Sequence, residues 1–309
     1  MRKKLLSILL VLSLMLALVP AAFAADEVWS SGTCGKEGDG SNITWTLYKS
    51  GLLTFTGTGA MRNYKSPVED GTPSPWAEHS GIRRIEIGEG ITSVGNNAFR
   101  GCAALEYVNL PQAATLGANS FEGCSALKEA SIPKVAKISN YAFSNCGKLV
   151  SVSAAAATEA GDFAFFGCAS LESISLPELK TLGKSAFAGC SSLKEFVAPN
   201  LSSIGDYAFC EVSESEDGTS VYNGCPLTGL DLTNVTSVGK YALAGLTQIK
   251  ELVIPSGAMS VGEGAFAGWT EEQVIRIDMS EEDCDWTEGW NRDMKATIYW
   301  KSAETEAEA

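Results

Sequence analysis

A phenylalanine returns every 22 residues through the middle of this chain of 309 residues, and no other feature limits its fold as strongly. The positions, in order, are Phe99, Phe121, Phe143, Phe165, Phe187 and Phe209, followed after a longer interval by Leu243 and Phe266. Self-similarity at a fixed period of this size indicates a solenoid, in which each repeat packs only on its neighbours. The repeat therefore predicts an extended binding surface rather than a catalytic pocket.

The rest of the repeat predicts one short strand and one turn per coil. Cysteine follows the phenylalanine by three residues and leucine by six, as in Cys124 and Leu127. An alternating apolar pair then indicates a strand with one buried face, and a proline ends it. A glycine four residues before the phenylalanine predicts a sharp turn, because glycine adopts backbone angles that other residues resist. About eight 22-residue coils would bury one continuous core.

The repeat resembles the leucine-rich repeats of the BspA-like family of secreted or cell-surface proteins. The resemblance is carried by Leu182-Gly183, Ala186-Phe187, Gly189-Cys190 and Leu193, which recur in register, and by the N-terminal runs 31–35 and 51–61. It covers roughly residues 26–300. It implies a right-handed, β-rich solenoid with a concave parallel sheet, and the N-terminal runs resemble the family's small β entry module. It also implies an extracellular, often adhesive role, and it does not imply a catalytic residue.

The first 24 residues have the composition of a signal peptide. A basic stretch at residues 2–4 precedes an apolar stretch at 5–19, and Ala22-Phe23-Ala24 is a small-x-small cleavage site. An N-terminal anchor helix is the alternative, but the apolar stretch is short for a membrane span. We expect the mature chain to be secreted or extracellular, in association with the cell surface or free of it.

The mature chain divides into four further segments. Residues 25–81 are predicted to form an N-terminal β module with a hairpin around residues 49–51, which covers the first coil. Residues 82–269 are the solenoid, with an outward loop inserted at 210–225. Residues 270–300 form a C-terminal cap that ends in a strand, and residues 301–309 form a disordered tail.

Net charge excludes some partners. Removal of Arg2, Lys3 and Lys4 takes the formal charge from −14 to −17. Such acidity disfavours nucleic acid and anionic lipid surfaces, which are themselves negative. No stretch after the signal peptide is long and apolar enough to insert into a membrane. The predicted partner is therefore an extracellular protein or another cell-surface ligand.

Nine cysteines in a secreted chain raise the possibility of disulfides. Five occupy the position three residues after the phenylalanine: Cys102, Cys124, Cys146, Cys168 and Cys190. We interpret these as buried free thiols, because free cysteine packs as a small hydrophobe, although rungs about 5 Å apart are within bridging range. Cys210 and Cys225 bracket the insertion and are the candidate disulfide, closing a loop of 14 residues. The alternative is that Cys225 joins the buried ladder and Cys210 stays unpaired.

Signals for chemistry are weak. The single histidine, His79, lies in a loop rich in proline and serine, and no nucleophile elbow accompanies it. Cysteine and histidine do not recur at zinc-site spacing, and Glu214, Glu216 and Asp217 lack the ligand pattern of a calcium loop. No acid pair for glycoside hydrolysis stands out among 37 carboxylates. We predict no enzyme, no metal and no cofactor, and keep a hydrolase as the third interpretation.

The outward positions of the predicted strands are the candidate ligand-binding face. They are Tyr107, Asn109, Glu129, Ser131, Ser151, Ser153, Ser173, Ser175, Glu195, Asp231 and Glu251. The middle of this set is a field of serines flanked by acids, and it lacks the aromatic platforms expected for sugar stacking. The alternative is a solvated sheet surface without a ligand. The sequence thus predicts an adhesion-type binding protein, or a structural spacer of the cell envelope.

Overall fold

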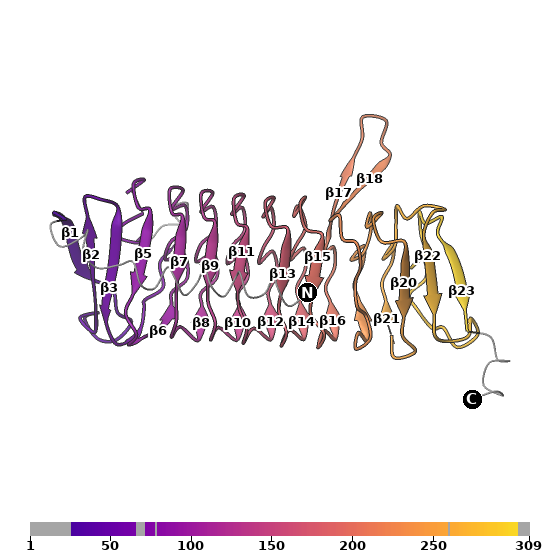
Figure 1. The fold of residues 1–309 in the computed structure, drawn as a ribbon, viewed down its shortest axis with the longest axis horizontal. Helices are drawn as coiled ribbons and strands as arrows, with labels where there is room; N and C mark the ends of the chain where they lie inside the picture. Colours follow the sequence, from indigo (N-terminus) through magenta and orange to yellow (C-terminus); the bar gives the residue numbers. More distant parts are fainter. Residues whose placement is uncertain (1–25, 66–71, 78, 259, 302–309) are drawn as a thin grey trace, which may run out of the picture.

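The computed structural model describes residues 26–65, 72–77, 79–258 and 260–301. The predicted signal peptide and residues 302–309 of the predicted tail lie outside these ranges. The described residues form strands and turns without a helix, stacked coil upon coil (Figure 1). The predicted β-solenoid is confirmed. No helix among the described segments has the length and hydrophobicity needed to cross a membrane.

Strands of three to six residues line one side of the stack, and only one strand of the opposite sheet is as long. The first of these form a seven-stranded sheet, ordered along the rod: β1 Val28–Thr33, β2 Ile43–Tyr48, β3 Leu52–Gly57, β5 Arg84–Ile87, β7 Tyr107–Asn109, β9 Glu129–Ser131 and β11 Ser151–Ser153. Two separate groups continue this side: β13 Ser173–Ser175 with β15 Glu195–Val197, then β20 Glu251–Ile254, β22 Val274–Ile277 and β23 Thr297–Trp300. We call the outward residues of β5 to β20 on this side the long-strand face.

This side is less continuous than the sequence predicted. The strand ladder is interrupted between β11 and β13, and again between β15 and β20, where the coil that carries the insertion contains no long strand. Asp231 lies in that coil, outside any strand. Its carboxylate instead accepts hydrogen bonds from the Thr233 backbone N–H at 2.9 Å and the Thr233 hydroxyl at 2.6 Å. A side chain–backbone turn thus replaces the expected strand position.

A second sheet of nine strands runs along the opposite edge of the coils. Its strands are β4 Gly59–Ala60, β6 Ile91–Val94, β8 Thr115–Leu116, β10 Lys137–Ile138, β12 Glu159–Ala160, β14 Thr181–Leu182, β16 Ser203–Ile204, β19 Ser237–Val238 and β21 Ser260–Val261. Most have only two residues, and the pairs that extend along the array are parallel and one coil apart, as for Lys137 opposite Glu159. This unbroken sheet keeps the coils in register.

The phenylalanine ladder fills the interior between the two sheets. Phe143 has no exposed surface, and its ring stacks on Phe121 at 5.4 Å and on Phe165 at 5.5 Å between centroids. The ladder begins one coil earlier than the repeat showed. Trp76 stacks on Phe99 at 5.6 Å, and its indole N–H donates to the Ala98 carbonyl at 2.7 Å. The N-terminal segment therefore closes the apolar end of the array.

The recurrent glycine has a different role from the predicted one. It does not adopt positive φ in any coil, as Gly183 illustrates. A Cβ built on Gly183 would stand 2.5 Å from the Gly161 carbonyl carbon, so glycine is required by close backbone packing between coils. Positive φ occurs two residues before the phenylalanine instead. It falls there on Asn97, Asn119, Tyr141, Phe163, Ser185, Tyr207 and Tyr241.

These left-handed residues form an inter-coil ladder of backbone hydrogen bonds. The N–H of Asn97 donates to the Ala118 carbonyl, and the N–H of Tyr141 donates to the Asp162 carbonyl, each at 2.9 Å. Left-handed backbone costs a non-glycine residue about 1 kcal/mol or more, and such bonds offset the cost. We call the side chains of this column the turn column, because they project together from one edge of the stack.

The insertion projects outward as expected, and it is an ordered β-hairpin rather than a loop without strands. Strands β17 Cys210–Glu214 and β18 Ser220–Gly224 pair antiparallel and project from the stack (Figure 1). The predicted Cys210–Cys225 disulfide is absent, since both residues are free thiols. Cys225 takes the ladder position and donates its S–H to the Phe187 carbonyl at 3.2 Å, whereas Cys210 packs among Ala244 and Ala267. Cys225 therefore belongs to the buried cysteine ladder and Cys210 forms no disulfide, which is the alternative given above.

The C-terminal cap continues the solenoid geometry. Strand β22 pairs parallel with β20, and β23 pairs parallel with β22, so the strand predicted near residue 298 is the last rung. Gly268 donates its N–H to the Asp293 carbonyl at 2.9 Å, as one coil does to the next. The ring of Trp290 meets Phe266 edge-on at 6.0 Å. Tryptophan thus covers the apolar end of the ladder on this side as well.

Candidate functional site

The structure places ten of the eleven predicted site residues on strands of the long-strand face. Alternation explains the arrangement: Val108, Ala130 and Ile174 point inward and are buried, while their neighbours point outward. Parallel register then aligns the outward residues into columns. Tyr107 lies opposite Glu129, Glu129 opposite Ser151, and Ser173 opposite Glu195. Asp231, in the coil without a long strand, is the exception.

The centre of this face is a set of unpaired hydroxyls. Ser151, Ser153, Ser173 and Ser175 are exposed, and none has a side-chain hydrogen-bond partner within the described protein. Glu129 and Glu195 bracket the first column of these serines. With strands about 4.8 Å apart, the two carboxylates stand about 14 Å apart across three coil spacings. The face therefore offers hydroxyl donors and acceptors between two negative charges.

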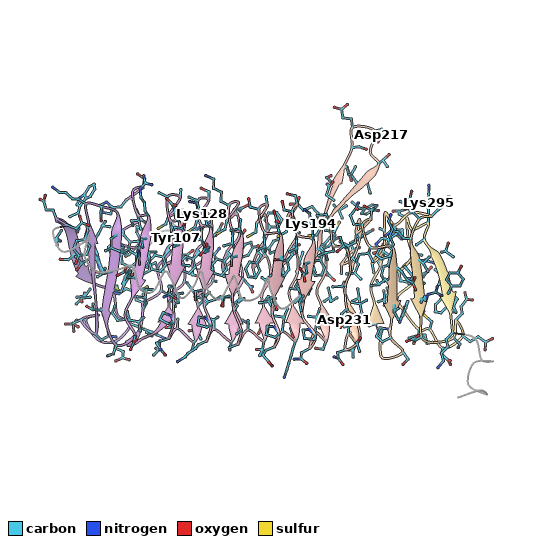
Figure 2. All side chains as sticks on the ribbon, in the orientation of Figure 1. Tyr107, Lys128, Lys194, Asp217, Asp231 and Lys295 are labelled. Atoms are coloured by element: carbon cyan, nitrogen blue, oxygen red, sulfur yellow. The ribbon has the colours of Figure 1, made fainter. Side chains whose placement is uncertain are left out.

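One end of the face is occupied by a charge ladder. The Lys128 ammonium lies 2.6 Å from the Glu106 carboxylate, which Arg83 also approaches at 3.5 Å. The same ammonium lies 5.7 Å from the Tyr107 ring centroid, and Figure 2 shows Tyr107 and Lys128 on neighbouring coils. The Lys128 hydrogen bond holds the pKa of Glu106 below its usual value. These groups pair with one another, whereas the exposed hydroxyls of the serine region have no partner within the described protein.

The cysteine ladder is buried and unsuited to nucleophilic chemistry. Cys124, Cys146, Cys168 and Cys190 each donate a hydrogen bond to the carbonyl of the phenylalanine one coil back, at 3.1–3.2 Å. Burial raises the pKa of Cys102 and of Cys146 to about 12. Since the thiolate is the reactive form, these cysteines serve as packing residues.

His79 is held by an aromatic neighbour. Its ring meets Trp29 edge-on, with centroids 5.3 Å apart. On the hairpin, Asp217 accepts hydrogen bonds from Ser215 and Thr219, which lower the pKa of its carboxyl to about 2. Figure 2 shows Asp217 at the far end of the hairpin. Across the described ranges, no three histidine, cysteine or acidic residues gather as a metal site would require.

Aromatic side chains that the strand-based analysis missed lie along the turn column. Tyr141 stacks on Phe163 at 4.7 Å, and Tyr207 stacks on Tyr241 at 5.4 Å. The hairpin adds Tyr222, which stacks on Tyr241 at 5.8 Å. The signal was present in the sequence, because these residues recur at one fixed position of the repeat, two before the phenylalanine. It was missed because the turn was treated only as a connection.

Comparison with known families agrees with the fold. A model of the BspA type leucine rich repeat region matches residues 76–157, 114–219 and 215–284, with six copies of the repeat. These matches together span more than half of the chain. None of the curated proteins compared with the chain is similar to it.

Solved structures of bacterial repeat proteins also align with the chain. A leucine rich cell surface protein from Faecalibacterium prausnitzii is 17% identical over 90% of this chain and 97% of its own, with a TM-score of 0.35. A leucine-rich repeat protein from Bacteroides ovatus is 18% identical over 90% of this chain and 67% of its own, with a TM-score of 0.38. The leucine rich repeat protein of T. pallidum is 25% identical over 56% of this chain and 88% of its own, with a TM-score of 0.40.

Proposed function

This chain belongs to the family of BspA-type leucine-rich repeat proteins, and we propose that it is a secreted, non-catalytic protein that binds another protein at the long-strand face. The observation that carries the proposal is the serine region between Glu129 and Glu195. Its serine hydroxyls are exposed and make no side-chain hydrogen bond within the described protein, and neither carboxylate forms an ion pair with a described residue. A rigid surface loses less conformational entropy on binding than a mobile loop does.

The extent of the face predicts modest affinity. From β5 to β15 the strands span about 24 Å, and three extended residues cover about 10 Å, so the strands alone offer roughly 240 Å². A stable interface buries about 800 Å² on each partner. We therefore expect micromolar binding of one copy, strengthened where several copies or ligands are displayed together. The partner's matching surface would carry basic side chains about 14 Å apart, to meet Glu129 and Glu195.

The second candidate function is a structural spacer of the cell envelope. One observation favours it: the serine region is made of small side chains on a flat sheet, and such a surface is also what solubility requires. A hydrolase finds less support, because His79 contacts Trp29 and the ladder thiols have raised pKa values. Extracellular location rests on the predicted signal peptide.

An array of extracellular and cell-surface proteins, probed with fluorescently labelled residues 25–309, tests the proposal. We expect saturable binding to at least one arrayed protein, reversed by unlabelled protein. Uniform background across the array, in an experiment where a known adhesive protein gives signal, would contradict a binding role and leave the spacer function.

A further inference from the structure

The hairpin formed by β17 and β18 is anchored to the solenoid at its base. Tyr222 stacks on Tyr241 with ring centroids 5.8 Å apart, and its hydroxyl donates to the Asp293 carboxylate at 2.6 Å. Cys210 is buried and packs against Ala244 of the next coil. The hairpin is therefore held in a fixed position, and a fixed strand loses less entropy on binding than a mobile loop does.

The register of the hairpin leaves one set of backbone groups of β17 unused. The Ser215 N–H donates to the Thr219 carbonyl at 2.9 Å, so the odd-numbered residues of β17 form the hydrogen-bonded pairs with β18. Bonded and non-bonded pairs alternate along an antiparallel ladder, so Val212 and Glu214 turn their N–H and C=O groups away from β18. None of these four backbone groups has a hydrogen-bond partner among the described residues.

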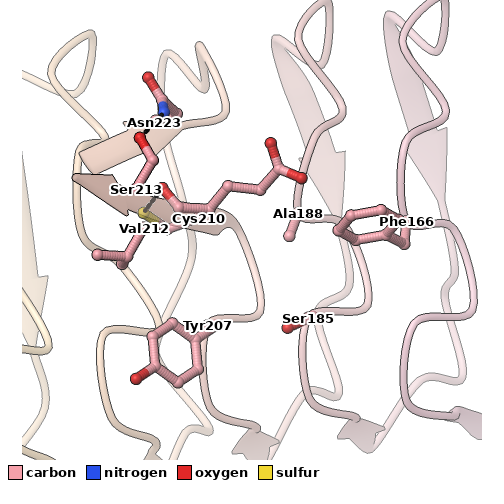
Figure 3. Close-up of a pocket in the computed structure, with 9 residues that line it drawn as sticks. Phe166, Ser185, Ala188, Tyr207, Cys210, Val212, Ser213 and Asn223 are labelled. Atoms are coloured by element: carbon pink, nitrogen blue, oxygen red, sulfur yellow. Dashed lines mark hydrogen bonds between the residues drawn. The ribbon is translucent and has the colours of Figure 1, made fainter. Parts of the chain in front are cut away.

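The two outer edges of the hairpin have different surroundings. At its base, the edge of β18 lies on the neighbouring coil, because a Cβ built on Gly245 would stand 2.4 Å from the Tyr222 carbonyl oxygen. The first four residues of β17 instead border an open depression, which Phe166 lines from the other side. Figure 3 shows Val212 and Phe166 on opposite sides of this depression. The edge of β17 is therefore the open one near the solenoid.

Negative charge is the only feature of β17 that opposes pairing with another strand. Exposed edges are usually blocked by proline, by a bulge or by charge. Residues 210–214 contain no proline, and their pairing with β18 has no irregularity. Glu211 and Glu214 are the charges on this strand, and neither carboxylate forms an ion pair with a described residue. Such an edge repels an acidic strand and admits a basic one.

Charge also distinguishes among the possible occupants. Glu216 and Asp217 add to the acidity of the hairpin, and residues 210–225 contain no lysine or arginine. Pairing of two copies edge to edge would bring two such sets of carboxylates together, which is unfavourable. Residues 302–309 of this chain carry three glutamates and no basic residue, so they are repelled in the same way. A basic segment of another protein is the occupant that the charges favour.

We propose that the free edge of β17 binds an extended, basic segment of another protein as a third strand of the hairpin. The segment forms backbone hydrogen bonds with Val212 and Glu214, and its basic side chains lie near Glu211 and Glu214. In strand addition of this kind, main-chain hydrogen bonds supply affinity and alternate side chains supply specificity. The site is separate from the long-strand face, and the proposal does not rest on a ligand there.

The two edges of the hairpin supply matched variants for the test. Val212→Pro removes an N–H that points away from β18, so the pairing of the two strands is kept. Ser220→Pro is the control, because it removes an outward N–H from the opposite edge, that of β18. Both variants are made in residues 25–309, and circular dichroism with thermal unfolding establishes that each is folded.

The probe is a capped heptapeptide of alternating lysine and valine, compared by isothermal titration with a lysine–proline peptide of equal charge that cannot form a strand. We expect the lysine–valine peptide to bind saturably, about tenfold or more tighter than the lysine–proline peptide. Val212→Pro should weaken this binding about tenfold, and Ser220→Pro should leave it within about twofold.

Hydrogen exchange locates the bound peptide without any substitution. We expect the lysine–valine peptide to slow amide exchange in residues 211–215 and to leave residues 220–224 unchanged. The proposal is overturned if the lysine–valine peptide does not bind, if the lysine–proline peptide binds equally well, or if the two proline variants weaken binding to the same extent. Self-association of the free protein that Val212→Pro abolishes would also overturn it, because the edge would then belong to a second copy.

Discussion

Replacing Phe143 by alanine removes a ring from the middle of the core, where both faces are in contact. The ring is fully buried and stacks on Phe121 at 5.4 Å and on Phe165 at 5.5 Å. Truncation of a buried phenylalanine to alanine typically costs 3–5 kcal/mol, and aromatic pairs contribute about 0.5–1.5 kcal/mol beyond their buried area. Because two pairs are lost here, we expect the upper part of that range, about 4–5 kcal/mol.

Phe143→Leu is the matched control, because the chain carries Leu243 at the same position of a later coil. Leucine keeps most of the buried apolar volume and loses the two ring stacks, so we expect a loss of about 1–2 kcal/mol. Urea unfolding of residues 25–309, followed by tryptophan fluorescence and circular dichroism, measures both changes in the free energy of unfolding. A loss under about 1 kcal/mol for Phe143→Ala would refute the assignment of a continuous stacked core.

Two further predictions concern the packing of the coils and the thiols. Gly183→Ala should lower the free energy of unfolding by about 1–3 kcal/mol, because its Cβ would lie 2.5 Å from the backbone of the neighbouring coil. Gly147→Ala is the control and should be neutral or stabilising, because no atom lies near its Cβ position. Equal effects of the two substitutions in urea unfolding would argue against close packing of the coils. In thiol titration with a disulfide reagent, only the half-exposed Cys284 should react quickly in the native protein at pH 8, and all nine cysteines should react in denaturant. A count of seven in denaturant would instead restore the disulfide between Cys210 and Cys225.

The repeat made the architecture predictable and left its exceptions hidden. A side chain at a fixed period reports its own environment, so Phe143 and Cys146 were assigned correctly to the interior. The reason for Gly183 was not predictable in the same way, because both a left-handed turn and a close backbone contact select glycine. Only the neighbouring coil, which the sequence does not place, distinguishes the two.

The hairpin shows a different limit. Asp217-Gly218 between two short segments that carry Val212, Val221 and Tyr222 is a hairpin signal, but residues 220–224 do not alternate, so the sequence indicated only an outward loop.

The central claim, that recognition of a protein partner belongs to the long-strand face, is tested most directly by comparing two variants against the strongest array partner. Binding isotherms would be measured for the unaltered protein, for Glu129→Lys combined with Glu195→Lys, and for a deletion of residues 212–223. We predict that the double charge reversal weakens binding about tenfold or more and that the deletion leaves it within a few-fold. Loss of the protein partner on deletion, with no effect of the double charge reversal, would contradict the account and assign recognition to the hairpin.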